Sequence, residues 1–210
     1  MTREGLPSRK DAISAGRANM KPKNNSPIAK RNRNNRSRGS HFEKVVADYL
    51  DMDVVPYSGS NARFGYGDVR DSKWLGECKN ITSDDGRYCI KQEWINDNRT
   101  KASGYGLMPY LAWMPSGRSE KFIILEKDIF SLLGVGHNIT VEIPKKAITA
   151  VNLFIDINDN WMKPVRTGKH IARLIFGDLE LFMMEISTFK YLIGNRGLKG
   201  SKTVYDNSTG

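Results

Sequence analysis

Apolar residues recur at helical spacing in one early stretch of the chain. Across residues 41–51 the large apolar side chains are one, three or four positions apart, which places them on one side of a helix: Phe42, Val45, Val46, Tyr49 and Leu50. Ser40 precedes them, and serine is a preferred N-cap residue. We therefore predict an amphipathic helix over residues 41–51 that begins at Ser40 and packs one side on a core.

Beyond that stretch, short apolar runs alternate with turn-forming residues. Such runs predict strands at residues 54–57, 66–70, 74–79, 88–90, 111–114, 122–125, 172–176 and 179–185. Helical patterns cover residues 91–105, 128–134 and 188–193, and residues 139–144 and 150–157 add extended segments. Strands interleaved with helices predict an α/β fold in which a mixed central sheet is flanked by helices.

Two of the predicted strands form an acidic hairpin. Asp71 and Ser72 are turn-forming residues between residues 66–70 and 74–79. With these two as the loop, Asp68 faces the same side of the hairpin as Glu77 and Lys79, diagonally across from Glu77. Diagonal neighbours lie roughly 7–8 Å apart at the backbone. The two carboxylates can then lean onto one divalent cation, with the Lys79 ammonium two residues beyond Glu77.

This set of groups suits phosphodiester hydrolysis. Mg²⁺ prefers oxygen ligands and keeps several waters, so the carboxylates of Asp68 and Glu77 and the backbone carbonyl of Cys78 make an open site, in which Mn²⁺ is expected to substitute. The metal acidifies a water and stabilises charge on the phosphate. Lys79, with a reference pKa of about 10.4, is expected to orient the attacking water as a cation.

Asp68 and the triplet Glu77-Cys78-Lys79 resemble the D…(D/E)xK core of the PD-(D/E)XK nuclease superfamily, most closely the archaeal-type Holliday-junction resolvases and their viral relatives. Three further pieces follow the family's order: residues 39–43 opening a helix, residues 58–60 before the hairpin and residues 88–93 after it. In the family a helix glutamate, the hairpin aspartate and the E-x-K pair form the metal site, and a loop serine assists. The resemblance therefore implies catalytic or metal-binding roles for Glu43, Asp68, Glu77 and Lys79, with Ser58 or Ser60 and Gln92 in support.

The resemblance covers about residues 39–113 and has two departures. Asp68 follows Gly67 where the family motif has proline, and the chain after Trp113 has no counterpart. Glu43 also has a local explanation, because an acidic residue in the first turn stabilises a helix and can complete a capping box with Ser40. Both roles are compatible.

The net charge of +10 is concentrated near the N-terminus. Residues 1–40 contain eleven Lys and Arg against Glu4 and Asp11, with almost no large apolar residues, so we predict that this segment is disordered when free. It is a solvated tail, an arm on nucleic-acid phosphates, or a nuclear localisation signal. The second interpretation assigns DNA contacts to Lys30, Arg31, Arg33, Arg36 and Arg38, and near the hairpin to Arg63 and Gln92.

The chain has two cysteines, Cys78 and Cys89, and no apolar run typical of an export signal or a membrane span. We expect both cysteines to be reduced core residues. We also expect no membrane partner. The expected location is the cytoplasm, that of the host cell if the protein is virus-encoded, or the nucleus if it is eukaryotic.

These observations predict four parts: a disordered basic tail (1–38), a nuclease core (39–120), an extension of the core sheet or a dimer surface (121–200), and a frayed end (201–210). The expected function is that of a Mg²⁺-dependent, structure-selective DNA endonuclease, a homodimer that acts on branched DNA such as four-way junctions. The alternatives are a restriction-like or repair endonuclease of the same fold, and a non-catalytic nucleic-acid-binding protein.

Overall fold

The structure, a computed structural model, describes residues 26–56, 67–83, 85–134, 140–142, 148–149, 152–176 and 178–194. The chain divides into two compact units, Met1–Ser37 and Arg38–Gly210. Helix α2 (Pro27–Leu50) begins in the first unit and ends in the second. All described strands belong to the second unit. In the described part of the chain, no helix has the length and apolar character needed to cross a membrane.

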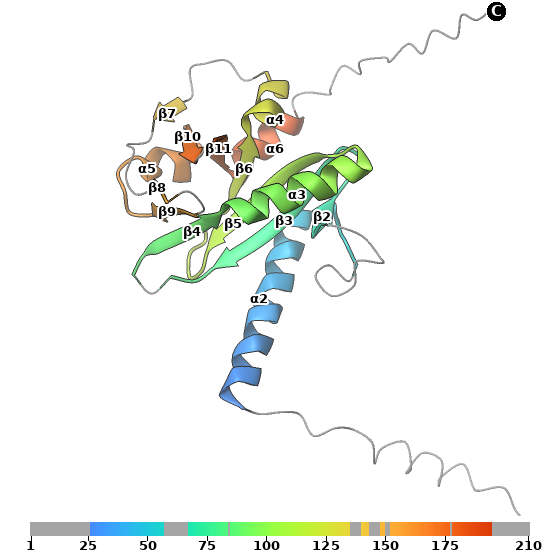
Figure 1. Cartoon of the computed structure of the whole chain (residues 1–210), viewed down its shortest axis with the longest axis vertical. Helices are drawn as coiled ribbons and strands as arrows, with labels where there is room; N and C mark the ends of the chain where they lie inside the picture. Colours follow the sequence, from blue (N-terminus) through green and yellow to red (C-terminus); the bar gives the residue numbers. More distant parts are fainter. Residues whose placement is uncertain are drawn as a thin grey trace, which may run out of the picture. The chain divides into compact units, whose positions relative to one another are not determined.

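An eight-stranded sheet forms the centre of the second unit (Figure 1). In spatial order its strands are β1 (Asp53–Val54), β2 (Val69–Arg70), β3 (Trp74–Ile81), β5 (Met108–Pro115), β6 (Phe122–Glu126), β11 (Leu179–Glu185), β10 (Ile171–Phe176) and β7 (Thr140–Glu142). The β3–β5 and β10–β7 pairs are parallel, and the other neighbours are antiparallel. The sheet is therefore mixed and mostly antiparallel.

Both faces of this sheet are covered. A second sheet has the order β4 (Arg87–Lys91), β9 (Asn152–Asp156) and β8 (Ile148–Thr149). The remaining described helices are α3 (Gln92–Tyr105), α4 (Lys127–Leu132), α5 (Met162–Arg166) and α6 (Ile186–Gly194). Residues of α2, α4 and α6 pack in one buried cluster, and residues of α3, α5, β4 and β9 pack in another. The predicted α/β fold with a mixed sheet and flanking helices is confirmed.

Strand β5 shows how the two cores share one sheet. Tyr110 and Ala112 belong to the cluster beneath α2, whereas Leu111 and Trp113 belong to the other cluster. Successive side chains of a strand point to opposite faces, so a strand buried on both sides is apolar at every position. This is the run of apolar residues from which the strand was predicted.

Helix α2 begins earlier than the sequence pattern predicted. The backbone N–H of Ala29 donates to Ser26 Oγ at 3.2 Å, and Pro27 takes the first helical position, where its missing N–H has no cost. Residues 27–38 are helical, so the prediction of disorder is wrong for them, while residues 1–25 lie outside the described residues. Ser40 lies inside the helix and is not its N-cap, and Glu43 is not in the first turn. The helix-cap explanation of Glu43 therefore fails.

Candidate functional site

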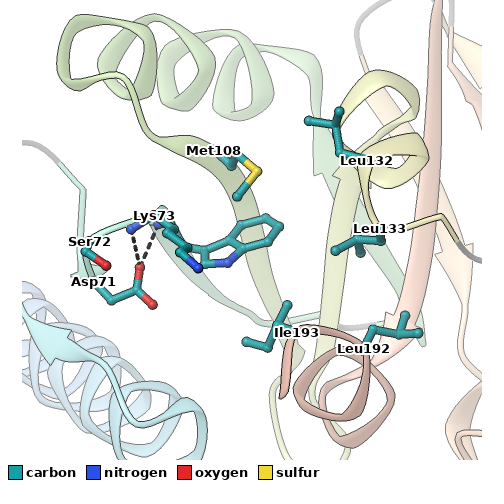
Figure 2. A pocket seen from close by; sticks show the side chains of 9 residues that line it. Asp71, Ser72, Lys73, Met108, Leu132, Leu133, Leu192 and Ile193 are labelled. Carbon is teal, nitrogen blue, oxygen red and sulfur yellow. Dashed lines mark hydrogen bonds between the residues drawn. The ribbon is translucent and has the colours of Figure 1, made fainter. Parts of the chain in front are cut away.

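The turn between β2 and β3 is displaced by one residue from the prediction. The backbone N–H of Asp71 donates to the carbonyl of Trp74 at 3.1 Å. The Asp71 carboxylate accepts the backbone N–H groups of Lys73 and Trp74, both at 2.7 Å (Figure 2). An aspartate that bonds the backbone two residues on favours such a turn. The loop is therefore Ser72-Lys73, and the predicted loop Asp71-Ser72 is wrong.

The observed pairing of β2 with β3 differs from the predicted one, and Asp68 is the residue just before the paired part of β2. Val69 pairs with Gly76, and the backbone N–H of Asp68 donates to the carbonyl of the same Gly76 at 2.8 Å, so Asp68 and Val69 both lie opposite the residue before Glu77. Asp68 is only 9% exposed, and its Oδ2 accepts the backbone N–H of Cys78 at 2.8 Å. The Asp68 carboxylate thus lies against the backbone of β3, beside Glu77.

The charges of three carboxylates act on the Cys78 thiol. Burial raises the pKa of this thiol well above its usual value, and the negative charges of Asp68, Glu43 and Glu77 raise it further, whereas Lys79 acts in the opposite direction. These charges come from α2, from the residue before β2 and from β3. The charges of Glu43, Asp68, Glu77 and Lys79, the residues that the resemblance selects, thus all act on the Cys78 thiol.

The faces of β3 separate these groups. Cys78 packs against the core cluster beneath α2, the helix that carries Glu43. By alternation, Glu77 and Lys79 lie on the face of α3. In the described pairings β2 reaches β3 only at Leu75 and Gly76, so β3 is at the edge of the sheet from Glu77 onward. Groups from the two faces can therefore meet around this edge, beside Asp68.

Glu77 carries an ammonium on each carboxylate oxygen. Lys79 Nζ lies 2.6 Å from Oε1, and Lys101 Nζ lies 3.2 Å from Oε2. Burial alone would raise the pKa of Glu77, but the two ammonium groups lower it below its usual value. Burial alone would lower the pKa of Lys79, but Glu77 and Asp68 raise it above its usual value. At neutral pH Glu77 is therefore a carboxylate and Lys79 an ammonium.

The donor atoms suit a hard cation, although their arrangement is not that of a closed site. Carboxylate oxygens of Glu43, Asp68 and Glu77 are the ligands that Mg²⁺ prefers. Among the described residues, no three His, Cys, Asp or Glu side chains are arranged to hold an ion. A metal at Glu77 would replace at least one lysine contact. The Cys78 thiol stays protonated, so only the backbone carbonyl of that residue suits such an ion.

The other predicted site residues lie elsewhere or cannot be placed. Ser58, Ser60 and Arg63 are outside the described residues. Gln92 is the first residue of α3 and is half-buried. In the first unit, exposed positions of α2 carry Lys30, Arg31, Arg33 and Arg36. Arg38, the first residue of the second unit, is half-buried.

Two residues of α3 that the sequence analysis missed hold this helix to the site. Asn98 is 2% exposed, and its Nδ2 donates to the carbonyls of Leu75 at 3.3 Å and Tyr110 at 2.8 Å. It thereby joins α3 to β3 and β5, which lie side by side beneath the helix (Figure 1). Lys101 follows three residues later on the same side of the helix. An asparagine at a core-facing helical position is the sequence signal for this contact.

A pocket of about 210 Å³ lies beside the hairpin turn (Figure 2). Its lining is mostly apolar and comes from the turn, the start of β5 and the ends of α4 and α6: Asp71, Ser72, Lys73, Trp74, Met108, Leu132, Leu133, Leu192 and Ile193. None of the four charged residues that gather around Cys78 lines it. The pocket and the charged site are therefore separate features.

Comparisons of the chain with protein-family models, curated proteins and solved structures found no match. What the site can do is inferred from its own groups. Three carboxylates can attract a divalent cation, and ammonium groups beside them can attract phosphate.

Proposed function

We propose that the protein is a divalent-metal-dependent DNA endonuclease. The observation that supports this most directly is the gathering of Glu43, Asp68 and Glu77 with Lys79 around Cys78. Carboxylates from α2, from the residue before β2 and from β3 act on the same thiol, and Asp68 also raises the pKa of Lys79, so acidic charge and an ammonium group are directed at one place. Because α2 begins at Pro27, with Ser26 as its N-cap, a helix cap does not account for Glu43.

Each group has a distinct role in this proposal. Asp68 and Glu77 would hold Mg²⁺ together with the Cys78 carbonyl, and Glu43 would add a further carboxylate. The bound metal supplies a more acidic water and neutralises charge on the phosphate. Lys79 remains protonated because its pKa is raised. It therefore donates hydrogen bonds to the attacking water or to a phosphate oxygen, and does not act as a base.

The substrate that we propose is branched DNA, in particular the four-way junction, cut by a homodimer. A two-fold symmetric junction needs cuts on opposing strands, and a two-fold dimer supplies two identical sites. This finer assignment depends on the resemblance of the acidic hairpin and the preceding helix to junction resolvases. A restriction-like or repair endonuclease would use the same groups on another DNA substrate.

A non-catalytic nucleic-acid-binding protein is the second candidate. It is favoured by the ion pairs of Glu77, whose two oxygens are held by Lys79 and Lys101. In such a protein Glu77 would only join β3 to α3, and no metal would displace the lysines. The two candidates differ in whether the chain cuts DNA.

Incubation with matched linear, flap and four-way-junction DNAs, in Mg²⁺ or in EDTA, distinguishes them. We expect nicking of the junction in Mg²⁺ and none in EDTA. Cutting of linear or flap DNA instead would favour the other endonucleases. Binding without cutting in Mg²⁺ and in Mn²⁺ would favour the non-catalytic protein.

A further inference from the structure

Three lysines from three different elements lie around Trp94 and Glu77, on the face of β3 that α3 covers. Lys79 belongs to β3, Lys91 ends β4 and Lys101 belongs to α3. The Nζ atoms of Lys79 and Lys91 each lie 5.6 Å from the centroid of the Trp94 ring. The two ammonium groups are therefore no more than 11.2 Å apart, which is twice that distance. We call these three residues the lysine cluster.

The cluster extends along the helix. Trp94 and Lys101 are seven residues apart on α3, which is two turns, so they share one side of the helix at a separation of about 10.5 Å along its axis. Lys101 contacts Glu77 at 3.2 Å, and Lys79 Nζ lies 2.6 Å from Glu77 and 5.6 Å from the centroid of the Trp94 ring. Lys79 and Lys101 thus share the Glu77 carboxylate, and Lys79 and Lys91 share the Trp94 ring.

Each lysine remains accessible to a ligand. The side chains of Lys79, Lys91 and Lys101 are 27%, 44% and 31% exposed. An indole face attracts a cation within about 6 Å of its centroid, so Trp94 keeps the first two ammonium groups in place without neutralising them. Lys91 also pairs with Glu93 at 3.1 Å, but that side chain is 62% exposed, and exposed pairs are weak.

We infer that the lysine cluster binds one strand of DNA next to the candidate catalytic groups. Its ammonium groups contact successive phosphates, and Trp94 positions those of Lys79 and Lys91. Three cations from three elements, two of them at Glu77 and two of them at Trp94, fit the repeated charges of a polyanion better than they fit one small anion. The inference depends on the proposed function for the identity of the polyanion as DNA. It does not depend on cleavage.

Binding of the full chain to a labelled oligothymidylate in EDTA, over a series of salt concentrations, tests this inference. The test variants are Lys91→Gln and Trp94→Phe. The matched control is Lys127→Gln, which removes a lysine of α4 that is 58% exposed and paired with Glu180 at 2.9 Å. All three variants change residues outside the proposed catalytic set, and their melting temperatures show whether they fold.

We expect Lys91→Gln to reduce the salt slope by about 0.7, the value for one lost phosphate contact on single strands, which corresponds to about five-fold in affinity at 0.1 M salt. Trp94→Phe should weaken binding in the same direction. DNA binding should change the tryptophan fluorescence of the wild type, and Trp94→Phe should remove the contribution of Trp94 to that change. Lys127→Gln should leave affinity and slope unchanged.

Two results would overturn the inference. One is wild-type affinity and slope in Lys91→Gln, and the other is an equal loss in Lys127→Gln, which would indicate a general effect of charge. If Trp94→Phe does not fold, Lys91→Gln decides alone. If Lys91→Gln weakens binding but the wild-type chain cuts no DNA in Mg²⁺, the strand-binding surface is supported and the endonuclease is refuted. If the wild-type chain cuts DNA in Mg²⁺ and Lys91→Gln binds DNA as well as the wild type, the endonuclease is supported and the strand-binding surface is refuted.

Discussion

At the scale of single residues, the site depends on side chains that enter one small region from separate elements. Alternation along β3 was enough to predict that Glu77 and Lys79 share a face and that Cys78 opposes them, and the packing of Cys78 beneath α2 agrees. The ion pair of Lys101 with Glu77 was not predictable. It requires α3 to cross β3 at one position, which the buried Asn98 determines.

The first prediction concerns Glu43. We expect Glu43→Gln to reduce cleavage strongly, because an anionic ligand beside Asp68 and Glu77 is lost. The far-ultraviolet circular dichroism should not change, since the helix is capped by Ser26 and not near Glu43. Cleavage assays and spectra on the same preparation check this. Loss of helix together with activity would assign Glu43 a structural role instead.

A second prediction concerns Gly76, between Leu75 and Glu77. A Cβ atom at this position would lie 2.2 Å from Cζ of Tyr110, a side chain that is 1% exposed. We expect Gly76→Ala to lower the free energy of unfolding by about 1–3 kcal/mol, as overpacking does. The control is Gly104→Ala in α3, where no atom lies within 4 Å of the added Cβ. There the gain in helix propensity should stabilise by roughly 0.5–1 kcal/mol.

The Asn98 contact gives a third prediction. Asn98→Ala removes both hydrogen bonds that join α3 to β3 and β5, and leaves a cavity in a buried position. We expect a loss of about 1–3 kcal/mol in stability, the usual cost of buried groups left without a partner. Urea titration measures this loss. The surface variant Thr100→Ala on the same helix, whose hydroxyl bonds only the carbonyl of Asn96, should change stability far less.

At the scale of elements, the strands were easier to predict than their limits and register. A strand buried on both faces shows its apolar run directly, as β5 does. The hairpin register depends on a side chain that bonds the turn, since the Asp71 carboxylate holds the N–H groups of Lys73 and Trp74. The start of α2 depends on Ser26 and Pro27, a cap signal within a polar segment that lacks apolar periodicity.

The basic part of α2 carries the fourth prediction. Its exposed side chains Lys30, Arg31, Arg33 and Arg36 are proposed to contact DNA phosphates. Replacing all four by Gln should reduce the salt slope on duplex DNA by about 0.9 for each contact that is lost. We expect any preference among DNA structures to persist, because the candidate catalytic residues belong to the second unit. An unchanged salt slope would show that this segment does not touch DNA.

At the scale of the whole molecule, the strands after Lys121 complete the central sheet, since β6 is followed in space by β11, β10 and β7. The sequence pattern alone leaves open whether this region extends the sheet or forms a dimer surface. Participation in the sheet does not exclude contacts between two copies. The convergence of α2, the hairpin and α3 on one site depends on this packing, and no local pattern in the sequence encodes it.

The fifth prediction concerns assembly. Paired cuts on opposing strands of a junction need two sites in fixed relation, so we expect a homodimer in solution and on junction DNA. Light scattering measures the mass, for comparison with the 23.7 kDa of one chain. A monomer in both conditions would contradict junction resolution by a dimer. The remaining interpretation would then be an enzyme that nicks one strand at a time.

The central claim is that Glu77 belongs to a metal-dependent catalytic site. Cleavage of a four-way junction by the wild-type chain and by Glu77→Gln, each in Mg²⁺ and in EDTA, tests it most directly, with junction binding measured on the same preparations. The account predicts cutting only by the wild type in Mg²⁺, with binding by the variant retained or tighter, because a carboxylate that repels phosphate is gone. Full cleavage by Glu77→Gln, or cutting by the wild type in EDTA, would contradict it.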